Sequence, residues 1–254
     1  MQNEMGSTHY GRHIRPQALT ARVTRLKITI CAILPSRATI VKKRTRRLKA
    51  SERSVRIAAG VLLDGGVVAF PTDTVYGIGV RSDDDAAVGR LYLVKERPIE
   101  KAIPLLLASA AEMPTVAREV PETAWRLAEA FWPGGLTIVL PKRETVSPAV
   151  SAEDSVAVRV PAHDVALSLI RAVGIPLATT SANISGRTSA TTADEVWEEL
   201  NGRIDLLLDA GECPGGIPST VVDLTTSVPK VLRQGAISVE RLRAVVGELG
   251  VRET

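Results

Sequence analysis

Residues 67–77 read Val-Val-Ala-Phe-Pro-Thr-Asp-Thr-Val-Tyr-Gly, a short apolar run followed at once by a polar loop. The apolar run 67–70 is typical of a buried β-strand, and it ends at Pro71. In the preceding residues 52–63, Val55, Ala58 and Leu62 fall at helical spacing, and Gly65-Gly66 would end that helix. A helix, a buried strand and a polar loop in this order predict an α/β fold.

The same alternation continues along the rest of the chain. Helices are expected over 83–97, from Pro121 to 131, from Asp164 to Gly174, from the capping box at Thr192 to Leu200, and from Ser238. Strands are expected at 136–140, 156–160, 175–178, 204–208, 220–224 and 231–233. Because these strands are rich in Val, Ile and Leu, the pattern predicts a sheet that is covered by helices.

Charge divides the chain into two unlike parts. Its 254 residues hold 32 Lys and Arg against 28 Asp and Glu, but residues 1–50 alone carry +11 and the remainder carries −7. We therefore expect residues 1–50 to be a basic, mostly disordered extension and residues 51–254 to form one globular domain. Three interpretations of the extension stay open: an arm that binds RNA or an acidic partner, an organelle-targeting peptide, or a tail without catalytic importance.

Several classes of protein are excluded by composition. Outside the basic extension, His163 and Cys213 are the only histidine and cysteine, which is too few for a zinc site of the usual type or a disulfide framework. A Ser/His/Asp or Cys/His catalytic group would have to use His163. No run approaches the roughly 20 apolar residues that span a bilayer, and no secretory signal is present. We expect a protein of the cytoplasm without a membrane partner.

Polar loops follow the expected strands, where ligands bind in open α/β sheets. These loops carry a set of cations, Lys95, Arg97, Lys101, Arg159 and Arg233, and a set of hydroxyls and amides, Thr74, Ser181, Asn183, Ser219 and Thr220. Such groups hold phosphate and carboxylate oxygens, so phosphoryl or nucleotidyl transfer is the chemistry that they favour. Taken singly, each piece has a plain structural alternative: Lys95 and Arg97 as helix-end cations, Arg159 in a salt bridge, and His163 as a helix cap.

Six motifs in order carry a more specific signal. They are Pro-Thr-Asp-Thr-Val-Tyr-Gly at 71–77, Lys-Glu-Arg-Pro at 95–98, Phe-Trp-Pro-Gly-Gly-Leu-Thr at 131–137, Val-Arg-Val-Pro at 158–161, Thr-Ser-Ala-Asn at 180–183 and Pro-Ser-Thr-Val-Val-Asp at 218–223. Over residues 52–245 the chain thereby resembles the YrdC/Sua5 family, in its short single-domain form. The resemblance implies a twisted, mixed open sheet with flanking helices and a concave, positively charged pocket. It also implies synthesis of L-threonylcarbamoyl-adenylate from L-threonine, bicarbonate and Mg²⁺-bound ATP for N6-threonylcarbamoyladenosine in tRNA.

The resemblance assigns roles position by position. Threonine contacts would be Thr74, Arg159, Ser181 and Ser219. ATP contacts would be Lys95, Arg97, Lys101, Ser155, Asn183, Thr191 and Arg233, with Lys95 and Arg97 catalytic and no metal bound by the protein itself. One departure is Ala102, where the family usually has proline. The implied partner is a tRNA threonylcarbamoyl transferase complex, and the basic extension adds weak RNA binding as an expectation. Two alternatives stay open, an RNA-binding or ribosome-assembly module and a different carbamoyl chemistry.

Overall fold

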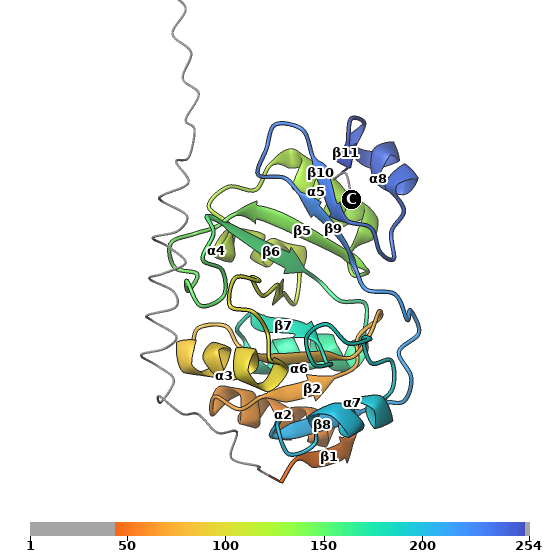
Figure 1. Cartoon of the computed structure of the whole chain (residues 1–254). Coiled ribbons are helices and arrows are strands. Elements are labelled where there is room, and N and C mark those ends of the chain that lie inside the picture. The colour runs from red at the N-terminus through yellow and green to blue at the C-terminus, as the bar shows by residue number, and fades with distance from the viewer. Residues whose placement is uncertain (1–43, 252–254) are drawn as a thin grey trace, which may run out of the picture.

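The computed structural model describes residues 44–251 (Figure 1). Its strands are β1 Arg46–Lys49, β2 Val68–Phe70, β3 Gly77–Arg81, β4 Leu105–Leu106, β5 Leu136–Pro141, β6 Ser155–Arg159, β7 Leu177–Ser181, β8 Leu206–Asp209, β9 Thr220–Asp223, β10 Lys230–Arg233 and β11 Gly250–Val251. Its helices are α2 Glu52–Leu63, α3 Asp85–Lys95, α4 Met113–Val116, α5 Glu122–Phe131, α6 Asp164–Val173, α7 Ala193–Leu200 and α8 Val239–Val246, with a 3₁₀ turn at Ala110–Glu112. None of the helices in this described part is long and apolar enough to cross a membrane.

Local sequence explains where several helices begin. The expected capping box before α7 is present, since the Thr192 side chain accepts from the Glu195 N–H and Glu195 reaches back to the backbone of Thr192. Ser238 caps α8 as expected. The plain structural alternative for His163 is confirmed at α6: its imidazole, rather than the side chain of Asp164, caps the helix and accepts the N–H of Val165 at 3.2 Å. Asp164 instead places a negative charge in the first turn, where the helix dipole favours it.

The strands form one mixed sheet in the order β1-β8-β2-β3-β7-β4-β6-β5-β9-β10-β11. The sheet contains both parallel pairs, such as β2 with β8 and β5 with β9, and antiparallel pairs, such as β3 with β7 and β5 with β6. Figure 1 shows β1, β8 and β2 with α2 and α7 at one end of the molecule, and β5, β9 and β10 with α5 and α8 at the other. The open, mixed sheet with flanking helices that the sequence predicts is confirmed.

Two apolar clusters hold the sheet between its helices. One joins α2 and α6 to β2 and β8, and includes Ala58, Leu62 and Leu169, each fully buried. The larger one runs along most of the sheet, including β2 and β8, and under α3, α5 and α7, and it includes Tyr76, Leu91 and Leu127, each fully buried. At roughly 25 cal/mol for each Å² of apolar surface removed from water, these clusters are the main source of stability.

The boundary expected at residue 50 is wrong for the residues just before it. Arg46–Lys49 forms β1, which pairs in parallel with β8 from Arg46 beside Leu206 to Lys49 beside Asp209. Thr45 is also buried and donates to the carbonyl of Ile204 at 2.7 Å. A basic strand is stable here because Arg47 pairs with Asp194 and Asp209. Residues 1–43, and with them most of the basic extension, lie outside the described residues.

Candidate functional site

A cavity of about 340 Å³ lies where the loops of several strands meet. That volume falls within the roughly 300 to 1,000 Å³ that is usual for small-molecule sites. Six of the eleven residues that the sequence assigns to the site line it: Thr74, Arg97, Arg159, Ser181, Ser219 and Arg233. They come from the loop between β2 and β3, the end of α3, the ends of β6, β7 and β10, and the approach to β9.

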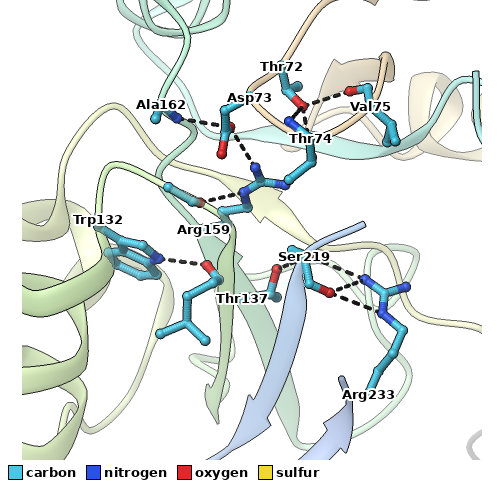
Figure 2. A network of polar contacts seen from close by, with 12 residues as sticks. Thr72, Asp73, Thr74, Val75, Trp132, Thr137, Arg159, Ala162, Ser219 and Arg233 are labelled. Atoms are coloured by element: carbon cyan, nitrogen blue, oxygen red, sulfur yellow. Dashed lines mark hydrogen bonds and ion pairs between the residues drawn. The ribbon is translucent and has the colours of Figure 1, made fainter. Parts of the chain in front are cut away.

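Arg159 is the most firmly held of the cations (Figure 2). Its guanidinium donates from Nε to the Gly134 carbonyl at 2.8 Å, from Nη1 to Thr74 Oγ1 at 3.0 Å and from Nη2 to Asp73 Oδ1 at 2.6 Å. A guanidinium has five N–H groups, so these bonds leave two for a ligand. Burial lowers the pKa of Arg159, Asp73 opposes that shift, and the charge of Arg233 adds to it.

Arg233 forms a second centre beside Ser219. It donates from Nε and Nη2 to the Ser219 carbonyl, at 3.2 and 2.8 Å, and from Nη2 to Ser219 Oγ at 3.3 Å. Ser219 Oγ lies 2.8 Å from the hydroxyl of Thr137, and both hydroxyls are buried in the cavity wall. Figure 2 shows Arg159 and Arg233 as two separate cationic centres, with Thr74 and Asp73 beside Arg159 and Ser219 beside Arg233.

Arg97 reaches the cavity because α3 ends on a left-handed residue. Glu96 closes the helix at φ +52°, and its carboxylate pairs with Arg203 at 2.7 Å. The next side chain, Arg97, donates to the carbonyls of Lys101 at 3.1 Å and Ala102 at 2.8 Å. Burial and the charge of Arg233 lower the pKa of Arg97, and burial lowers that of Arg233. Cations that repel one another in a partly dry cavity form a site that an anion would stabilise.

Lys95 lies behind the cavity wall rather than in it. Its side chain is 1% exposed, and Nζ donates to the carbonyls of Ser181 and Asn183, the latter at 2.6 Å. Burial, reinforced by the charge of Arg97, lowers the pKa of Lys95 to about 7. In this structure Lys95 therefore holds the loop that presents Ser181 to the cavity.

The four remaining predicted residues also lie away from the cavity wall. Lys101 is exposed, and Thr191 donates from its backbone N–H to Glu195 at 2.6 Å. Ser155 starts β6 and shares the face of Ala157 and Arg159, but only those two line the cavity. Asn183 donates to the carbonyls of Ile184 and Arg187, while its Oδ1 is buried without a hydrogen-bond partner among residues 44–251.

Three residues of the site carry roles that the sequence did not assign. Thr137 and Thr72 line the cavity, and Asp73 holds Arg159 from behind. All three belong to motifs that stand out in the sequence. Their roles become visible only in three dimensions, where Thr72 contacts Thr74, Asp73 contacts Arg159 and Thr137 contacts Ser219. Within the described part of the chain, no group of three or more His, Cys, Asp or Glu residues is placed to hold a metal ion.

Comparisons with known proteins agree with one another. The family model Sua5_yciO_yrdC, described as telomere recombination, matches residues 60–235. The chain is 44% identical over 206 residues to the threonylcarbamoyl-AMP synthase of Pyrococcus abyssi, covering 81% of this chain and 61% of that protein. It is 39% identical over 209 residues to the enzyme of that name in Bacillus subtilis, covering 82% and 60%.

A solved structure from one of these organisms also matches this chain in its fold. The crystal structure of P. abyssi Sua5 complexed with L-threonine matches with a TM-score of 0.78 and 43% identity, over 82% of this chain and 62% of that one. The chain thus spans about 60% of the length of these relatives.

Proposed function

The chain belongs to the Sua5/YciO/YrdC family, and on that premise we propose that it makes L-threonylcarbamoyl-AMP from L-threonine, bicarbonate and ATP. The reaction is a nucleotidyl transfer that releases pyrophosphate. Its product would serve the N6-threonylcarbamoyladenosine modification of tRNA through a separate transferase complex.

The observation that carries this proposal is the grouping of Arg97, Arg159 and Arg233 around one cavity. Asp73 is the one carboxylate bonded to these three side chains among the described residues, so the cavity keeps an excess of positive charge. Such a site suits a ligand with several anionic groups, and an amino-acid carboxylate beside a triphosphate is such a ligand. A relative of similar fold, P. abyssi Sua5, has been solved in complex with L-threonine.

The amino acid is proposed to bind at the Arg159 centre. The two N–H groups that Arg159 keeps after its three internal bonds would hold the substrate carboxylate. Ser181 and Ser219 line the same cavity and supply further short polar contacts.

The triphosphate is proposed to bind toward Arg97 and Arg233, which lack a carboxylate partner among residues 44–251. Positioned cations of this kind offset the negative charge that develops on phosphate oxygens during transfer. The described residues do not form a metal cage of their own. Magnesium therefore belongs in the proposal as the ion that ATP carries, and no step is assigned to it.

The chemistry needs no nucleophile from the protein. The threonine nitrogen forms a bond to the carbon of carbon dioxide derived from bicarbonate and loses a proton, which gives an N-carboxylate. One oxygen of that carboxylate then bonds to the α-phosphorus of ATP, and the bond from that phosphorus to pyrophosphate breaks. The chain's part is to hold the two substrates in contact and to balance charge.

Pyrophosphate release with each substrate omitted in turn tests this proposal. Wild-type protein with ATP, Mg²⁺, bicarbonate and L-threonine should release pyrophosphate, and omission of either L-threonine or bicarbonate should stop the release. Equal release without L-threonine would show that the amino acid is not a substrate.

RNA binding by the basic N-terminal residues is a separate proposal that rests on their charge. Because β1 belongs to the sheet, a shortened chain should begin at Arg44 rather than at Ser51. Such a chain should lose RNA affinity in a salt-dependent filter-binding assay and keep its pyrophosphate release. Unchanged RNA affinity would contradict a role for residues 1–43.

A further inference from the structure

The hydroxyl of Thr72 has only one arrangement that fits its neighbours. A threonine hydroxyl donates one proton and accepts at two positions. Thr72 Oγ1 lies 2.7 Å from the carbonyl oxygen of Val75, which can only accept, so Thr72 must donate there. The backbone N–H of Thr74 donates to Thr72 Oγ1 at 3.2 Å and fills one of its two acceptor positions.

The hydroxyl of Thr74 is fixed in turn. Its oxygen lies 3.0 Å from Thr72 Oγ1, and because the Thr72 proton is already committed to Val75, Thr74 is the donor in this bond. Arg159 Nη1 donates to Thr74 Oγ1 at 3.0 Å and takes one of its lone pairs. Thr74 lines the cavity, so what it offers to a ligand is a single acceptor and no donor.

The other polar groups of the cavity wall offer hydrogen-bond donors to a ligand, in contrast to the acceptor at Thr74. Arg159 has two N–H groups left and cannot accept. Thr137 and Ser219 share one hydrogen bond at 2.8 Å, and whichever of them donates, the other hydroxyl keeps its proton for the cavity. The cavity therefore has donors at Arg159 and at the Thr137–Ser219 pair, and an acceptor at Thr74.

We propose that Thr74 accepts a hydrogen bond from the α-amino group of the amino-acid substrate, and that Thr72 is the positioning residue that keeps Thr74 an acceptor. The proposal rests on the proposed function and makes it more specific. With the substrate carboxylate on Arg159, the α-amino nitrogen is the donor nearest to that carboxylate, one carbon away. Arg159 Nη1 and Thr74 Oγ1 lie 3.0 Å apart, so the two residues can contact neighbouring groups of one small molecule.

This polarity bears on the reaction as well as on binding. The amino nitrogen must present a lone pair to the carbon that it attacks. An acceptor that holds one of its N–H groups limits the rotation of the amine, and so fixes the direction of that lone pair. It also disfavours molecules that place a carboxylate or another pure acceptor against Thr74, because two acceptors would face each other without a proton.

Calorimetric titration with two amino acids tests the assignment of the amine. L-Threonine and L-2-aminobutyrate share the α-amine and differ in the side-chain hydroxyl. Thr74→Val should weaken the binding of both ligands by a similar factor, about tenfold for the loss of one charge-assisted hydrogen bond. Thr74→Ser, which keeps the hydroxyl, should restore most of the affinity for both.

Two results would overturn the assignment. If Thr74→Val weakened only L-threonine and left L-2-aminobutyrate unchanged, the contact would be to the side-chain hydroxyl. If it weakened neither, Thr74 would make no contact. Failure of the wild-type protein to bind either amino acid would instead contradict the proposed function, so the two failures are distinguishable.

Steady-state kinetics tests the role of Thr72. Thr72→Val removes the hydroxyl that accepts from Thr74, so the Thr74 proton is free to turn toward the ligand. We expect KM for L-threonine to rise about tenfold and kcat to fall because the amine is less well oriented, with KM for ATP changed less than about threefold. Thr72→Ser should behave like wild type. Thr115→Val, at an exposed threonine that donates to Glu112, is the matched control for the substitution itself. Equal damage from Thr72→Ser and Thr72→Val, or none from either, would contradict the positioning role.

Discussion

Asp73 and Arg159 form an ion pair at 2.6 Å whose two side chains are 13% and 8% exposed. The same carboxylate oxygen, Asp73 Oδ1, accepts the backbone N–H of Ala162 at 3.0 Å. One aspartate thus connects the loop after β2, the last residue of β6 and the turn before α6. Since Asp73 lies behind the cavity wall, its effect on a ligand passes through Arg159.

Removal of Asp73 should therefore cost stability more than a surface substitution does. Asp73→Ala leaves the buried Arg159 without its counter-charge, and we expect the free energy of unfolding to fall by about 3 kcal/mol. Asp73→Asn keeps an acceptor for Arg159 and Ala162, so its loss should be closer to 1 kcal/mol. Urea unfolding at pH 7 measures both, and two variants as stable as wild type would show that the pair contributes nothing.

Lys95 should make stability depend on pH. The unfolded chain keeps the lysine proton up to about pH 10.5, whereas the folded chain releases it near pH 7. Between these values the unfolded state binds more protons, so the Lys95 contribution to the free energy of unfolding rises with pH. In urea unfolding, the free energy of unfolding of wild type minus that of Lys95→Met should increase from pH 7 to pH 10. A constant difference would mean that burial does not lower this pKa.

ATP binding gives a second measure of the same lysine. If phosphate oxygens approach Lys95 as the family resemblance implies, binding should raise its pKa and draw a proton from solution near pH 8. Titrations of wild type in two buffers of different ionisation enthalpy would show this uptake, and Lys95→Met should abolish it. Equal proton uptake by both proteins would assign the protonation to another group.

Arg97→Gln should impair the nucleotide side of the reaction. The substitution removes a cation from the cavity wall and keeps a side chain that can hydrogen-bond. We expect the rate of pyrophosphate release to fall by roughly 10²- to 10³-fold, as is usual for loss of one preorganised charge, and the affinity for L-threonine to stay within about threefold. Arg171→Gln, at an exposed arginine of the last turn of α6, is the matched control. Wild-type rates in Arg97→Gln would remove Arg97 from the site.

Gly215 should affect substrate binding although it does not line the cavity. A Cβ at this position would lie 2.4 Å from the carbonyl oxygen of Asp73 and 3.0 Å from Thr74 Cα, so Gly215→Ala must displace the loop that bears both residues. We expect KM for L-threonine to rise more than KM for ATP. Gly60→Ala in α2 meets no atom within 4 Å, and it should be stabilising by about 0.5 to 1 kcal/mol with unchanged kinetics. An unchanged KM for L-threonine in Gly215→Ala would show that the loop accommodates the added methyl group without displacing Asp73 and Thr74.

Local sequence was sufficient to predict the elements that are marked by a helix cap or by an apolar run. The capping box at Thr192, the serine cap at Ser238 and the apolar run of β5 appear in the structure where the pattern predicts them. The strands that the pattern does not predict are β1, β3, β4 and β11, and of these β1 and β4 pair only with strands far along the chain. β3 contains Gly77 and Gly79, which sheets usually disfavour, but Gly79 is needed because a Cβ there would lie 2.7 Å from Thr179 Oγ1 on β7.

The candidate site was also predictable only where its signals are local in the sequence. Motifs identified Thr74, Arg159 and Ser219 as polar groups beside strand ends, and the structure brings them around one cavity. They could not show that Lys95 turns behind the wall, because that depends on the carbonyls of Ser181 and Asn183, nearly ninety residues away. The direction of each hydroxyl proton likewise follows only from contacts in three dimensions.

In the proposed reaction, this cavity joins threonine, the carbon of bicarbonate and AMP into one molecule. Incubation of the wild-type protein with ¹⁴C-bicarbonate, L-threonine, ATP and Mg²⁺, followed by rapid chromatography and mass spectrometry, tests it most directly. Label should appear in a product that contains both threonine and adenylate, formed by wild type and lost in Arg97→Gln. Pyrophosphate release without label in any threonine-containing product would contradict it.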